Sequence, residues 1–188
     1  MGLIKTIKES FARAKAVGMQ AKAELEEAAR YRAMTRAEAE QLSDEELWNC
    51  VSFRLCRLED GKALAEESLA RRAVYTVDTF DREVQNGGLC QYFVNSSRET
   101  APELEEALTQ VGAESYRKLF HDFVTENDID VTQLDSFIVH STEEFEAQNE
   151  RYPFDAFDEA YYDLYQREPL DAHCTAYIRR HLGDFFDR

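Results

Sequence analysis

A stretch in the middle of the chain combines a long helical pattern with an abrupt stop. Apolar residues recur there at spacings of four, three and four, which is the stripe of an amphipathic helix: Ala73, Val77, Phe80 and Val84. The pattern reaches Asn86-Gly87-Gly88. Asn-Gly can also form a hairpin turn, but a hairpin needs flanks with a period of two. We therefore predict a left-handed helix C-cap at Asn86-Gly87, with a further turn at Gly88.

Leu89 to Ser96 then predicts a short second helix, and the polar side chains around the turn admit two interpretations. In the favoured one they have structural partners inside the fold, as buried polar groups usually do. The members of this structural motif are Glu83, Asn86, Gly87, Gly88, Gln91 and Asn95. The alternative is a small enzyme or ligand-binding module with a pocket at the turn. In that case Cys90 is the best candidate nucleophile, and the glycine amides could bind an anion.

The whole chain predicts an all-α fold, a single multi-helix bundle with a basic N-terminal helical arm. No run of alternating β-branched residues is long enough to support a sheet. Residues 1–42 form the expected arm and residues 43–188 the acidic helical domain. Capping boxes are expected at Ser43/Glu46 and Thr100/Glu103. The predicted core contains Val77, Phe80, Phe93, Leu119, Phe120, Phe123, Tyr161 and Ile178.

The arm is a predicted helix over about residues 3–33, with Leu3, Ile7, Phe11 and Ala14 on one stripe. The first 36 residues hold eight Lys and Arg against four Glu. The apolar face is too narrow for a membrane-surface helix. We expect the arm to dock on the domain or on a second copy of the chain, which leaves a homodimer as one possibility.

The net charge of −16 argues against direct binding to nucleic acid, because affinity for phosphates comes from Lys and Arg. The chain contains no run of 18 apolar residues and no signal peptide, so we expect no membrane association and a cytoplasmic location. Its four cysteines form no C-x-x-C pair, and its four histidines are scattered. A calcium loop starting at Asp128 lacks the required Gly and Glu. We predict no metal and no cofactor.

Acidic residues dominate residues 121–168, where fourteen Asp and Glu face two Arg. One row, at helical spacing, contains Asp155, Glu159 and Asp163 with Asp158 alongside, and a second contains Glu143, Glu146 and Glu150. Like charges four residues apart cost a helix a few tenths of a kcal/mol per pair, so stability does not explain the rows. They are either a solvated face kept for solubility or a surface that imitates nucleic-acid phosphates.

The run Asn86-Gly-Gly-Leu-x-Gln-Tyr-Phe-x-Asn95-Ser resembles the signature of the DNA-mimic-protein family, a bacterial all-helical domain. The resemblance continues through Glu103–Leu108 and the closing helices, and covers approximately residues 70–186. The chain departs from the family pattern at Leu89 and in the acidic insert at residues 125–151. The resemblance implies a non-enzymatic interaction protein that regulates transcription. Its acidic rows would occupy the DNA-binding surface of a transcription factor or other basic DNA-binding protein.

Overall fold

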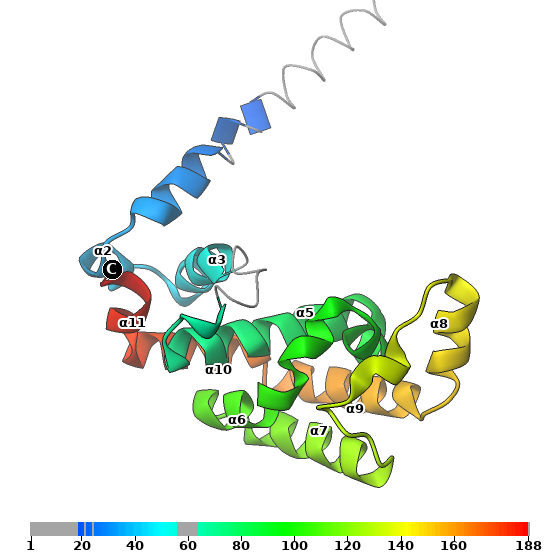
Figure 1. Ribbon diagram of the computed structural model, residues 1–188. Helices are drawn as coiled ribbons and strands as arrows, with labels where there is room; N and C mark the ends of the chain where they lie inside the picture. Colours follow the sequence, from blue (N-terminus) through cyan, green and yellow to red (C-terminus); the bar gives the residue numbers. More distant parts are fainter. Residues whose placement is uncertain (1–18, 21, 24, 56–63, 188) are drawn as a thin grey trace, which may run out of the picture.

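The structure is a computed structural model that describes residues 19–20, 22–23, 25–55 and 64–187 (Figure 1). Its elements in chain order are α2 (Arg36–Ala39), α3 (Asp44–Leu55), α5 (Leu69–Val94), the 3₁₀ helix η1 (Ser96–Thr100), α6 (Ala101–Val111), α7 (Glu114–Glu126), the 3₁₀ helix η2 (Leu134–Phe137), α8 (Thr142–Asn149), α9 (Phe154–Arg167), α10 (Leu170–Arg180) and α11 (Leu182–Phe186). These ranges contain helices and no strand, so the predicted all-α class is confirmed.

Helix α5 is the centre of the bundle, and α3, α6, α9, α10 and α11 all pack against it (Figure 1). The ring of Phe80 on α5 makes edge-on contacts with Tyr92, Phe120 and Tyr161, at centroid distances of 5.3, 5.9 and 5.8 Å. This geometry favours aromatic pairs because a ring edge meets a ring face. The predicted core residues are buried except Leu119, which is partly exposed because it lies at the edge of the buried face of α7.

Local sequence explains some helix ends and misses others. Ser43 and Glu46 form the predicted capping box, since each backbone N–H donates to the other residue's side chain. The box expected at Thr100 is wrong. The Thr100 hydroxyl donates to the Ser97 carbonyl and pairs with the Tyr92 hydroxyl, while Glu103 pairs with Arg72. Helix α5 begins at Leu69, where the Ser68 side chain accepts a hydrogen bond from the Arg71 N–H.

The expected N-terminal arm is described only in part, as a helix over residues 25–33 that leads away from the body (Figure 1). Its proposed apolar stripe, Leu3 to Ala14, lies outside the described residues. Tyr31 and Met34 are buried in the same core as α3. The Arg54 guanidinium donates to the backbone carbonyls of Tyr31, Met34 and Phe185, at 2.8, 2.7 and 2.8 Å. One cation thus joins the N-terminal segment to the C-terminal helix.

Candidate functional site

Helix α9 has two chemically different faces. Phe154, Phe157 and Tyr161 are buried against α5 and α7. On the other side Asp155, Glu159 and Asp163 are exposed. Within the described part of the chain none of these three carboxylates makes an ion pair or hydrogen bond. The predicted row therefore points to solvent and keeps its charge uncompensated.

Asp158, which sequence reasoning placed in the same row, has a different environment. Its Oδ1 accepts a hydrogen bond of 2.9 Å from the backbone N–H of Leu89. Burial raises the pKa of this half-buried carboxyl, and the nearby Asp155 adds to the effect. The structure thus separates Asp158 from the exposed row and gives it a structural contact with α5.

That contact lies at a break in α5. Gly88 has φ +78° and ψ 177°, while Gly87 has an extended φ of −163°. The left-handed conformation was predicted at Asn86-Gly87, and this is wrong because Gly88 is the residue with positive φ. A Cβ on Gly88 would lie 2.1 Å from Asp158 Oδ2, so only glycine leaves room for the carboxylate. Asp158 caps the helical segment after the break from a separate helix.

Tyr162 completes the same contact one turn further along α9. Its hydroxyl donates to the carbonyl of Val84 at 3.1 Å, on the other side of the break. Asp158 and Tyr162 therefore satisfy an N–H and a C=O that the interrupted helix leaves without helical partners. The sequence analysis placed Asp158 in the acidic row without its contact to the break, and it assigned no role to Tyr162. Their spacing of four puts them on one face of α9, but no local signal links that face to Gly88, about 70 residues earlier.

The second row, Glu143, Glu146 and Glu150, is exposed on and just after α8. A hydrogen bond from its own backbone N–H, together with one from the Ser141 hydroxyl, lowers the pKa of Glu143, so this carboxyl stays charged. None of the three makes an ion pair among the described residues. The exposed carboxylates of the two rows lie on and just after α8 and on α9, which follow one another in the chain, and we refer to them together as the acidic face: Glu143, Glu146, Glu150, Asp155, Glu159 and Asp163.

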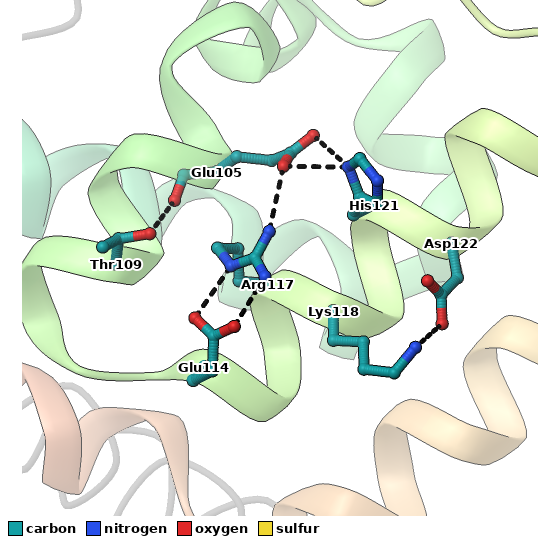
Figure 2. Close-up of polar contacts among 7 residues, drawn as sticks. All are labelled: Glu105, Thr109, Glu114, Arg117, Lys118, His121 and Asp122. Carbon is teal, nitrogen blue, oxygen red and sulfur yellow. Dashed lines mark hydrogen bonds and ion pairs between the residues drawn. The ribbon is translucent and has the colours of Figure 1, made fainter.

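The acids of α6 and α7 contrast with this face. Figure 2 shows Arg117 between Glu105 and Glu114, with His121 against Glu105 and Lys118 against Asp122. Hydrogen bonds from Arg117 lower the pKa of Glu114 and raise that of Arg117. Glu105, Glu114 and Asp122 on α6 and α7 therefore have cationic partners close by. On the acidic face negative charge is available to a partner.

Three polar side chains around the Asn86-Gly87-Gly88 turn pair with one another, whereas the Asn86 side chain is exposed. The amide nitrogens of Gln91 and Asn95 both donate to Glu83 Oε2, at 2.7 and 2.8 Å. Burial raises the pKa of the Cys90 thiol to about 12, which keeps it protonated at neutral pH. The hydrogen bonds support the structural interpretation of Glu83, Gln91 and Asn95, and the raised pKa does not favour Cys90 as a nucleophile.

The comparisons with known proteins bear on this geometry. A family model described as DMP19-like protein matches residues 65–181, more than half of the chain. The chain belongs to the DMP19-like protein family. The match confirms the resemblance to DNA-mimic proteins, and it spans α5 through α10, including α8 and α9. A comparison with curated proteins finds no match, and neither does a comparison with solved structures.

The described residues contain no group of three His, Cys, Asp or Glu side chains arranged to hold a metal ion. In the same part of the chain, no helix is long and apolar enough to cross a membrane. The acidic face is therefore the candidate site that the geometry supports best.

Proposed function

We propose that the acidic face binds the DNA-binding surface of a basic protein and excludes DNA from it. The family to which the chain belongs suggests a DNA-mimic role. The acidic face supplies the chemistry, since it presents fixed negative charge that Lys and Arg side chains would otherwise find on phosphates. The partner is a transcription factor or another basic DNA-binding protein.

The observation that carries the proposal is the absence of cation partners on the α9 row within the described structure. Asp155, Glu159 and Asp163 are exposed and unpaired, although α7 shows that this fold can neutralise its own acids. Successive residues of the row lie about 6 Å apart on the helix. Neighbouring phosphates on one nucleic-acid strand have a similar separation. Basic side chains that bind successive phosphates of DNA would therefore meet the carboxylates of this row at a comparable spacing.

Affinity capture from the source organism tests this function. The immobilised full chain is expected to retain a basic DNA-binding protein at low salt. Raising the salt from about 0.1 M to about 1 M should release it, because screening shortens the range of exposed charges from about 10 Å to about 3 Å. Duplex DNA added at low salt should release it too. A retained protein that resists both treatments would contradict the proposal.

Two variants make the capture specific. The first, Asp155→Asn/Glu159→Gln/Asp163→Asn, removes three charges from the acidic face. The second, Glu45→Gln/Glu66→Gln/Glu106→Gln, removes three exposed charges from other helices and segments. The proposal requires the first variant to lose the captured protein and the matched control to keep it. Equal loss in both would show that total charge, rather than the acidic face, is responsible.

A further inference from the structure

An aromatic side chain lies among the exposed carboxylates of α9. Tyr162 is 43% exposed, although Phe154, Phe157 and Tyr161 of the same helix are buried. It follows Asp155 by seven residues and Glu159 by three, spacings at which side chains share one helix face. The acidic face therefore carries one exposed ring within its α9 row.

The body of the protein holds this ring in place. The Tyr162 hydroxyl donates to the Val84 carbonyl at 3.1 Å, and the ring of Tyr161 meets that of Tyr162 edge-on at a centroid distance of 5.8 Å. A side chain that is already fixed loses little conformational entropy when a partner binds. Fixed tyrosines are frequent anchors of protein interfaces for this reason, and because they supply a large contact area.

The ring of Tyr162 has no cation of its own within the described structure. Elsewhere arginines lie over aromatic rings, for example Arg151 over Tyr152 at 5.5 Å, but no described arginine lies over Tyr162. The one arginine of α9, Arg167, donates its Nε–H to the backbone carbonyl of Asp163. The ring and the unpaired carboxylates beside it can therefore receive a cation from a partner.

We propose that Tyr162 makes the acidic face select arginine over lysine in its partner. This inference rests on the proposed function, since it specifies which basic side chain the acidic face binds. A guanidinium is planar, so it can stack on the tyrosine ring while its N–H groups donate to the neighbouring carboxylates. A lysine ammonium is compact and strongly hydrated, and it gains less from an aromatic face. The carboxylates attract both cations, and the ring distinguishes them.

Two synthetic peptides of equal length and charge test the selection. Arginine alternates with serine in one peptide, and lysine alternates with serine in the other. Fluorescence anisotropy of the labelled peptides measures their Kd values for the full chain. The arginine peptide should bind about threefold more tightly or better, which is the scale of one exposed cation–π contact. The NMR signals of the Tyr162 ring should shift more with the arginine peptide than with the lysine peptide.

The outcomes separate the two proposals. Equal affinities, or ring signals that do not respond to the arginine peptide, would overturn the selection and leave the acidic face as a binding surface. If neither peptide bound, the proposed function and the selection would both be contradicted. Asp155→Asn/Glu159→Gln/Asp163→Asn should weaken the binding of both peptides, because both depend on the carboxylates.

Substitutions of Tyr162 assign the selection to its ring. Tyr162→Leu removes the ring and should lower the ratio of the two affinities about threefold. Tyr162→Phe keeps the ring and should keep the ratio. The control Leu69→Ala shortens an exposed apolar side chain at the start of α5 and should bind as the parent does. An unchanged ratio in Tyr162→Leu would refute the assignment, and the ring signals of the parent decide it if this variant does not fold.

Discussion

Replacing Gly88 by alanine tests how α9 holds the break in α5. Gly88 has φ +78° and ψ 177°, a region that is essentially restricted to glycine and costs other residues about 1–3 kcal/mol. The new Cβ would also lie 2.1 Å from Asp158 Oδ2 and displace the carboxylate from Leu89 N–H. Loss of a helix cap typically costs about 1–2 kcal/mol. The free energy of unfolding should therefore fall by about 2–5 kcal/mol.

Urea unfolding followed by circular dichroism measures this change, and Gly87→Ala is the matched control. Gly87 has an extended φ, and its added Cβ would meet only the Gln91 side chain, closest at the flexible amide end and 3.3 Å from its Cβ. Gly87→Ala should therefore cost about 1 kcal/mol or less, the scale of one hydrogen bond. With Asp158→Ala in the background, Gly88→Ala should cost only its backbone strain. If Gly88→Ala were no worse than Gly87→Ala, the assignment of strain and capping to Gly88 would be refuted.

Three further predictions follow from buried groups. Cys90 should react slowly with iodoacetamide at pH 8 in the native protein and quickly in urea, because burial raises the pKa of its thiol to about 12. Mass spectrometry of the labelled peptide measures both rates, and rapid labelling of the native protein would contradict the burial of Cys90. Burial raises the folded-state pKa of Asp81 above its ordinary value near 3.8, so the native state holds the proton more tightly than the unfolded state does. The contribution of Asp81 to stability therefore decreases as the pH rises from about 4 through the raised pKa. Asp81→Asn should lose this pH dependence, and parallel pH profiles of the unfolding free energy for parent and variant would contradict the prediction. Arg54→Ala should destabilise the protein by about 3 kcal/mol or more in urea unfolding, since it leaves several carbonyls without their charged donor; full stability in Arg54→Lys would show that the fork geometry is unimportant.

The sequence predicted those features that repeat along one helix. The apolar stripe from Ala73 to Val84 identified the buried face of α5, and the spacing of Asp155, Glu159 and Asp163 placed them on one exposed face. Both results follow because a period of 3.6 residues fixes which side chains share a face. Residues at the border between the buried and the exposed face of a helix, such as Leu119 on α7, were less well predicted because a partly buried border has no sharp pattern.

Features that depend on distant residues could not be predicted in this way. The choice of Gly88 rather than Gly87 for positive φ depends on Asp158, which is brought to it by packing of α9 on α5. Thr100 satisfied the capping pattern, yet its hydroxyl pairs with Tyr92 instead.

Competition with DNA tests the proposed function most directly. The captured partner is first bound to a fluorescent duplex, and fluorescence anisotropy then follows displacement of the duplex by added protein. The parent and the Glu45/Glu66/Glu106 control should displace it equally. The Asp155/Glu159/Asp163 variant should need about tenfold more protein, since three exposed charges at about 0.5 kcal/mol each amount to about 1.5 kcal/mol and a factor of ten corresponds to about 1.4 kcal/mol. Displacement by this folded variant at the parent's concentration would contradict the acidic-face proposal.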